Sequence, residues 1–179
     1  SKSFNNLFGF EKFNSKKFNN FLKKKNLFFV YKLHSNEERY LKDYKINLDS
    51  NFSFNLNNEI LLNNSLDFYE VLNCADILMT DYSGIFIDFL LLDKPIIFNP
   101  TDLKYYNKTR GFLYTPYEQW TPGTKVFSQD SLVGEINNIL KGYDSFASQR
   151  ELLKKIWHKY CDNKSSYRSA KILEKLYHR

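Results

Sequence analysis

The sequence contains no apolar run that approaches the roughly 20 residues a helix needs to span a bilayer, and no secretory signal is visible in it. It has only two cysteines, Cys74 and Cys161, which lie far apart and outside any metal-ligand spacing. We interpret them as unpaired thiols in a reducing cytoplasm. The chain begins with Ser1 and its only methionine is Met79, so we interpret it as a piece of a longer protein.

What the sequence does contain is typical of a globular domain. Its 179 residues are 42% apolar and 18% aromatic, which is enough for one domain with a buried core and excludes a disordered chain. The net charge of +6 favours anionic partners, such as nucleotides, phosphopolymers or an anionic membrane face, without selecting among them.

Hydrophobic periodicity predicts helices and strands in alternation, and this order is typical of an α/β fold with a Rossmann-like parallel sheet flanked by helices. We expect one domain over residues 1–179 that ends in two helices. The expected helices cover about 11–25, 35–41, 65–74, 83–92, 129–141, 145–160 and 164–178; the expected strands cover about 27–33, 44–48, 76–80 and 95–98; loops follow at about 49–60 and 100–124.

The most informative stretch covers residues 75–98, which combine a buried strand, a polar turn, an apolar helix and a second buried strand. The turn from Thr80 to Gly84 places hydroxyls, a carboxylate and a glycine where the strand ends and the helix begins. Ligands bind at this edge of open parallel sheets, and the free N–H groups of a helix start suit a phosphate. Gly84 would let a ligand approach the backbone closely. The alternative is that Asp81 or Ser83 only caps the helix.

Asp88 is the one charge in the apolar helix that follows the turn. A carboxylate in such a helix needs a partner, because an unpaired buried charge is costly. Asp88 lies four residues after Gly84 and therefore one turn further along the same face. It could reach ligand hydroxyls such as a ribose diol, and the alternative is a salt bridge to a nearby lysine or arginine.

Two further residues could take part in the chemistry. His34 follows a buried strand, where it is either a strand-end histidine or a catalytic group. Arg110 lies in the long segment at 100–124 and could hold a phosphate by charge-assisted hydrogen bonds, although neighbouring lysines are equally cationic.

Four segments in order resemble the CDP-glycerol glycerophosphotransferase family, which comprises the teichoic acid primases and polymerases and related capsule polymerases. The resemblance covers about residues 10–142. The matching segments are the continuous block Cys74–Phe98, the strand end Lys32-Leu-His34, the run Arg110–Tyr114 and the Pro122-Gly123 turn.

The resemblance implies a GT-B architecture with two lobes, of which this chain would be the C-terminal, nucleotide-binding lobe. The implied reaction transfers glycerol phosphate, or a related polyol phosphate, from a CDP-activated donor to a growing polymer and releases CMP. Such enzymes work in the cytoplasm as peripheral proteins on the inner face of the bacterial membrane, because their acceptors are lipid-linked. We expect no metal, no cofactor and no nucleic-acid partner.

The resemblance also implies roles for single residues. Asp88 would contact the ribose side of the nucleotide, and His34 would stabilise phosphate charge or act in proton transfer. Arg110 belongs to the expected donor site. The donor pyrophosphate would be held by Thr80, Asp81, Ser83 and Gly84.

The sequence departs from the family pattern in several places. Gly84 stands where the family often has a second serine, and Ser35 stands where a proline is expected. The upstream Pro-Thr-Trp-Arg segment and the acceptor lobe, with its expected histidine, are absent. We therefore expect this chain to be inactive alone, with the deprotonating base in the missing lobe.

Two other functions fit parts of the pattern. A GT-B sugar-nucleotide glycosyltransferase or a UDP-N-acetylglucosamine epimerase would use a similar phosphate turn, but Tyr82 and the spacing from Asp88 to Lys94-Pro95 favour the polyol-phosphate family. A basic nucleic-acid-binding module fits the many cations and aromatic residues. No recognised nucleic-acid motif supports it, and core packing explains the phenylalanines better.

Overall fold

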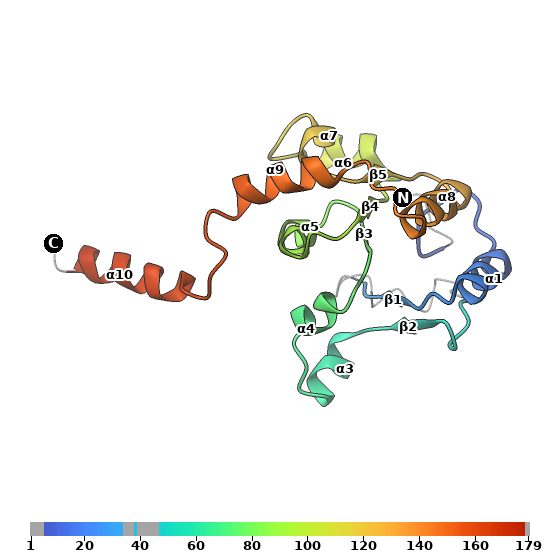
Figure 1. Ribbon diagram of the computed structural model, residues 1–179, viewed down its shortest axis with the longest axis horizontal. Helices are drawn as coiled ribbons and strands as arrows, with labels where there is room; N and C mark the ends of the chain where they lie inside the picture. Colours follow the sequence, from blue (N-terminus) through green and yellow to red (C-terminus); the bar gives the residue numbers. More distant parts are fainter. Residues whose placement is uncertain (1–5, 34–37, 39–46, 178–179) are drawn as a thin grey trace.

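The computed structural model describes residues 6–33, Glu38 and residues 47–177, and it shows short strands with helices beside them (Figure 1). The elements are α1 (Ser15–Lys25), β1 (Phe29–Tyr31), β2 (Ser53–Asn55), α3 (Asn58–Asn63), α4 (Phe68–Asn73), β3 (Leu78–Thr80), α5 (Ile85–Phe89), the 3-10 helix η2 (Leu90–Leu92), β4 (Ile96–Phe98), α6 (Leu103–Thr109), α7 (Tyr117–Trp120), β5 (Thr124–Lys125), α8 (Gln129–Leu140), α9 (Ala147–Trp157) and α10 (Ser165–Tyr177).

The strands pair in parallel throughout, as the alternation of helices and strands predicts. β1 pairs with β2, and a second sheet has the order β3-β4-β5. Thr80 at the end of β3 lies opposite Phe98 at the end of β4, and Phe98 lies opposite Lys125 in β5. The carboxyl ends of these three strands therefore meet at one edge of the sheet.

The central strand β4 divides the core into two layers. Ile96 and Phe98 pack with Phe89 of α5 and Leu153 of α9. Ile97, which points to the opposite face, belongs to a second cluster that includes residues of α1 and α8. All three β4 residues are buried, so helices cover both faces of this sheet, as expected for a buried parallel sheet.

Side-chain caps and a glycine mark the ends of α1 and α8. The Asn14 side chain accepts a hydrogen bond from the Lys17 backbone at the start of α1, and Ser128 caps α8 in the same way. Gly142 adopts a positive φ of 83° directly after α8 and ends it. α1 begins at Ser15 rather than near residue 11, because the preceding segment runs as a loop.

The helix predicted at 65–74 begins later than expected. Asp67, and not Ser65, is its N-cap, and it forms a capping box with Glu70. Ser65 has a φ of 52°, which does not fit the extended backbone of an N-cap residue. α4 therefore starts at Phe68.

Two segments predicted as loops are partly regular. β2 lies within the loop expected at 49–60 and α3 begins in it; α6 and α7 lie within the irregular segment expected at 100–124, and β5 begins at its last residue. The strand expected at 44–48 lies mostly outside the described residues, and Asn47 and Leu48 are not in a strand. The helix expected at 35–41 lies outside them except for Glu38, which is helical.

The last helix, α10, extends away from the rest of the protein beyond the connection that follows α9 (Figure 1). It contains no buried residue. Among the helices of the described ranges, not one is both long enough and apolar enough to cross a bilayer.

Candidate functional site

The polar turn predicted from the sequence lies at the carboxyl edge of the three-stranded sheet. Thr80 is the last residue of β3 and is half-buried, and its carbonyl accepts a hydrogen bond of 2.8 Å from the Asn99 backbone after β4. Asp81, Ser83 and Gly84 follow at the surface. The structure therefore brings these four predicted residues together at the edge where parallel sheets bind ligands.

The turn is closed by its own side chains. Asp81 Oδ1 accepts from the Ser83 backbone at 3.2 Å, and Ser83 Oγ accepts from the Ile85 backbone at 3.5 Å. The N-cap residue of α5 is Gly84, which has no side chain to accept a hydrogen bond from the first backbone N–H groups of the helix. A Cβ added to Gly84 would meet open space, so the backbone here is accessible to a ligand.

Aromatic side chains pack against the turn and hold its backbone in place. The Tyr82 hydroxyl donates to Asp102 Oδ1 at 2.8 Å, and its ring stacks on Tyr106 of α6 at 3.9 Å between centroids. The Tyr117 hydroxyl donates to the Asp81 carbonyl at 3.1 Å. Burial is the main cause that raises the pKa of both tyrosines, so each stays a neutral donor.

A half-buried lysine, Lys125, packs beside Tyr117. Lys125 Nζ donates to the carbonyls of Thr121 and Gly123 and lies over the rings of Phe98 and Tyr117. Burial lowers the pKa of Lys125 to about 8. The turn preceding β5 packs tightly, because a Cβ on Gly123 would lie 2.1 Å from the Ile96 carbonyl oxygen.

Asp88 lies on α5, one helical turn beyond Gly84, and is half-buried. Its Oδ2 accepts a hydrogen bond of 3.1 Å from the Tyr69 hydroxyl of α4. This hydrogen bond raises the pKa of Tyr69. Within the described ranges Asp88 forms no ion pair, so the alternative of a lysine or arginine partner is not met there.

The remaining two predicted residues lie elsewhere. Arg110 is exposed at the end of α6, and its backbone N–H donates to the carbonyl of Tyr106, the residue that stacks on the turn. His34 lies outside the described residues. Lys32, two residues earlier, lies 5.8 Å from the ring centroid of Phe68 in α4, so the strand that leads to His34 ends beside the helix that carries Tyr69.

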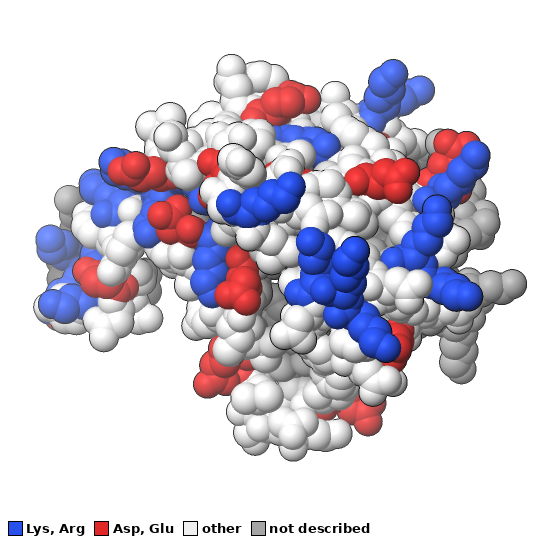
Figure 2. Space-filling view, turned by 45° about the vertical axis from the view of Figure 1, so that its right-hand side comes forward, with Lys and Arg blue, Asp and Glu red and all other residues white. Residues whose placement is uncertain are grey.

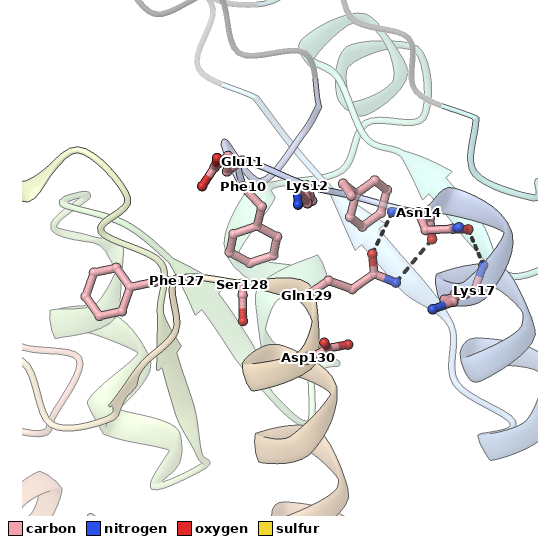
Figure 3. Close-up of a pocket in the computed structure, with 10 residues that line it drawn as sticks. Phe10, Glu11, Lys12, Asn14, Lys17, Phe127, Ser128, Gln129 and Asp130 are labelled. Atoms are coloured by element: carbon pink, nitrogen blue, oxygen red, sulfur yellow. Dashed lines mark hydrogen bonds between the residues drawn. The ribbon is translucent and has the colours of Figure 1, made fainter.

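A cavity of about 550 Å³, not predicted from the sequence, opens between the N-terminal ends of α1 and α8 (Figure 3). Two reciprocal hydrogen bonds between Asn14 and Gln129, of 2.7 and 3.1 Å, join these helix ends. The wall of this cavity contains both acidic and basic side chains and none of the predicted site residues. The lining residues are Phe10, Glu11, Lys12, Phe13, Asn14, Lys17, Phe127, Ser128, Gln129 and Asp130.

Basic and acidic side chains are interspersed on the face that Figure 2 shows, so this face carries no large patch of one charge. Sequence reasoning missed Tyr69, Tyr117 and Asp102, whose contacts with the site span 19 to 36 residues.

The parallel strands, the helices on both faces and the polar turn at the strand ends define an α/β protein with a Rossmann-like arrangement. A family model, described as CDP-Glycerol:Poly(glycerophosphate) glycerophosphotransferase, matches residues 2–175. The chain belongs to this family, as the resemblance in its sequence predicts.

Curated relatives agree with this assignment. Over 108 residues the chain is 35% identical to a teichoic acid glycerol-phosphate primase of Bacillus subtilis, covering 60% of this chain and 27% of that protein. Over 75 residues it is 41% identical to the teichoic acid ribitol-phosphate polymerase TarL of Staphylococcus aureus, covering 40% and 13%. The chain thus spans about a quarter or less of the length of these two relatives.

Solved structures show the same fold. A structure of the wall teichoic acid polymerase TagF, as a histidine-to-asparagine variant soaked with CDPG, superposes with a TM-score of 0.68 at 21% identity, over 90% of this chain and 38% of that one. The variant without that soak gives the same TM-score over 98% of this chain and 41% of that one. The fold is therefore that of one GT-B-like lobe.

Proposed function

We propose that this chain is the C-terminal, donor-binding lobe of an enzyme that transfers glycerol phosphate, or a related polyol phosphate, from a CDP-activated donor to a growing teichoic-acid-like or capsular polymer. The observation that carries the proposal is the polar turn at the carboxyl edge of β3, with Asp88 one helical turn deeper on the same helix. Membership of the glycerophosphotransferase family supports it.

The donor would lie along the start of α5. Its diphosphate would meet the backbone around Ser83 and Gly84 and the hydroxyls of Thr80 and Ser83. Asp88, whose second carboxylate oxygen forms no hydrogen bond to a described residue, would accept from the ribose diol. Arg110, at the end of the helix that stacks on Tyr82, would add positive charge near the phosphates.

The reaction follows from positioning and charge neutralisation. The acceptor hydroxyl attacks the phosphorus on the polyol side of the donor, so a new O–P bond forms while the bond from that phosphorus to the bridging oxygen breaks. CMP leaves with the bonding electron pair. The N–H groups after Ser83 and the imidazolium of His34 stabilise the charge on the leaving group, and a base in the rest of the longer protein takes the hydroxyl proton.

The setting of the reaction is part of the proposal. The acceptor is a lipid-linked polymer, and the enzyme acts as a peripheral protein on the inner face of the bacterial membrane. The named relatives include glycerol-phosphate and ribitol-phosphate enzymes, so both polyols are candidate cargoes.

Calorimetric titration of this chain with CDP-glycerol, CDP-ribitol and UDP-N-acetylglucosamine tests the proposal. We expect a CDP-polyol to bind, the UDP-sugar not to bind, and Ser83→Ala and Asp88→Asn each to weaken binding several-fold. Matched controls are Ser148→Ala on α9 and Asp76→Asn, whose side chain is 96% exposed before β3. If only the UDP-sugar binds, the sugar-nucleotide function is favoured. If Ser83→Ala and Asp88→Asn both bind the CDP-polyol as tightly as the unmodified chain, the assignment is contradicted.

A further inference from the structure

The helix that carries Asp88 is too short to hold its position without contacts from other elements. α5 has five residues, and η2 continues it with three more. Isolated helices shorter than about 12–15 residues are marginal in water, so neighbouring elements must keep this segment in place. The turn from Asp81 to Gly84 holds the start of α5. The other end of the segment is contacted by α9, which lies beside it (Figure 1).

Two basic side chains on one face of α9 reach the carboxyl end of this segment. Lys154 Nζ donates to the carbonyl of Leu91 in η2 at 3.2 Å. Four residues earlier, Arg150 is 2% exposed, and its Nε lies 3.6 Å from Oδ1 of Asp93, directly after η2. Both Nη atoms of Arg150 bind the Asp144 carboxylate, which pairs its buried charge. Positive charge is favourable here, because the last carbonyls of a helix have no partner within it.

His158 lies four residues after Lys154, at the end of α9, and contacts α5 itself. Its Nε2 lies 2.7 Å from the carbonyl oxygen of Ile87, the residue before Asp88. A carbonyl oxygen can only accept, so Nε2 carries a proton and donates it. The hydrogen bond therefore holds the peptide group that joins Ile87 to Asp88.

Packing on both sides makes Asp88 a fixed point in the structure. Leu153 of α9 is 3% exposed and belongs to the same buried cluster as Phe89 and Leu90, so α9 is seated firmly against this segment. From the opposite side, the Tyr69 hydroxyl of α4 donates to the Asp88 carboxylate at 3.1 Å. Asp88 is thus held through its backbone by α9 and through its side chain by α4.

We propose that His158 is a positioning residue for Asp88 and thereby sets the selectivity of the site for a ribose diol. This inference rests on the proposed function, in which Asp88 accepts from the ribose hydroxyls. Without the hydrogen bond from His158, the peptide between Ile87 and Asp88 is free to rotate, and the carboxylate no longer meets the hydroxyls in one orientation. The diphosphate end of the ligand, held at the turn, should not depend on this contact.

Calorimetric titration of the 179-residue chain with CDP and with 2′,3′-dideoxy-CDP tests this proposal. The two ligands differ only in the ribose hydroxyls, so the ratio of their affinities reports the contribution of Asp88. In the unmodified chain we expect CDP to bind roughly tenfold or more tightly, since hydrogen bonds to a charged group are lost in the analogue. His158→Phe should reduce this ratio by about threefold or more and leave the affinity for dideoxy-CDP unchanged.

Two amide variants separate the hydrogen bond from the shape of the ring. His158→Gln carries a side-chain N–H that can take the place of Nε2, so it should keep most of the ratio. His158→Asn carries the same amide one methylene closer to the backbone, so it should lose the ratio as His158→Phe does. In the Asp88→Asn background, none of the His158 variants should change the ratio further.

Lys154→Met is the matched structural control. It removes the contact with the Leu91 carbonyl, four residues beyond Ile87, from the same face of α9. It should keep the affinity ratio of the unmodified chain, whatever its effect on the melting temperature. Thermal unfolding of every variant shows whether a change in the ratio follows the hydrogen bond or only the stability.

An unchanged ratio in His158→Phe, or equal weakening of both ligands, would overturn the proposal, because His158 would then act only on stability. Gln and Asn variants with the same ratio would overturn it as well. The proposed function fails in a different way. A chain that binds neither ligand contradicts donor binding, whereas a chain that binds both equally removes the ribose role of Asp88 and this inference with it.

Discussion

Replacing Tyr69 by Phe removes a single hydroxyl at the proposed nucleoside end of the site. That hydroxyl donates to Asp88 Oδ2 at 3.1 Å, and the side chain is 51% exposed on α4. If Asp88 receives the ribose diol, the Tyr69 hydroxyl fixes the orientation of the carboxylate, and its loss should weaken donor binding. The ring of Phe keeps the apolar contacts.

The expected size of the effect follows from the contact. A hydrogen bond to a charged group contributes about 1.5–3 kcal/mol when buried, but water can replace an exposed donor, so we expect about 0.5–1 kcal/mol here. This corresponds to roughly two- to fivefold weaker binding. Thermal unfolding should change little, because the hydroxyl lies at the surface.

The assay is calorimetric titration of CDP-glycerol into Tyr69→Phe, Asp88→Asn and the double variant. Because Tyr69 is expected to act through Asp88, Tyr69→Phe should have no further effect in the Asp88→Asn background. Unchanged or tighter binding by Tyr69→Phe would show that its hydroxyl competes with the ligand or is irrelevant to it. An equal loss in both backgrounds would refute the proposed coupling.

Three further predictions concern the frame of the site. Gly123→Ala should lower the free energy of unfolding by about 3 kcal/mol, because its Cβ would lie 2.1 Å from the Ile96 oxygen; an unchanged melting temperature would contradict this packing. The pKa of Lys125 falls from 10.5 to about 8 on folding, so the unfolded chain binds more protons between these values, and the free energy of unfolding should rise with pH there. Partial exposure limits this rise to about 1–2 kcal/mol, and denaturant titrations should show that Lys125→Met abolishes it. Gly84→Ser should leave the melting temperature unchanged, because a Cβ meets open space, and should change donor affinity in calorimetry, because it places a side chain beside the proposed diphosphate; unchanged affinity would argue against a ligand at this turn.

Sequence patterns located the parts of the fold that local signals control. The strand, polar turn, helix and strand over residues 75–98 appear in that order, because polar residues at the turn and at Asp93-Lys94 separate three apolar runs. The helix predicted at 129–141 matches α8 closely, because its ends depend on the neighbouring residues Ser128 and Gly142.

Other parts depend on contacts between distant residues, which a local pattern does not report. β2 lies in a segment rich in Asn and Ser and is a strand because it pairs with β1. Tyr82 reaches Asp102 across 20 residues, and Tyr117 reaches Asp81 across 36. The turn residues were therefore predictable from the sequence, whereas the contacts that Tyr82 and Tyr117 make around the turn were not. The catalytic role of His34 stays a prediction.

A crystal structure of this chain with CDP-glycerol tests the central proposal most directly. We predict that the diphosphate lies within hydrogen-bonding distance of the backbone at Ser83 and Gly84, with the ribose hydroxyls at Asp88. A donor bound instead in the cavity between α1 and α8, with the turn empty and Asp88 still joined only to Tyr69, would contradict the account.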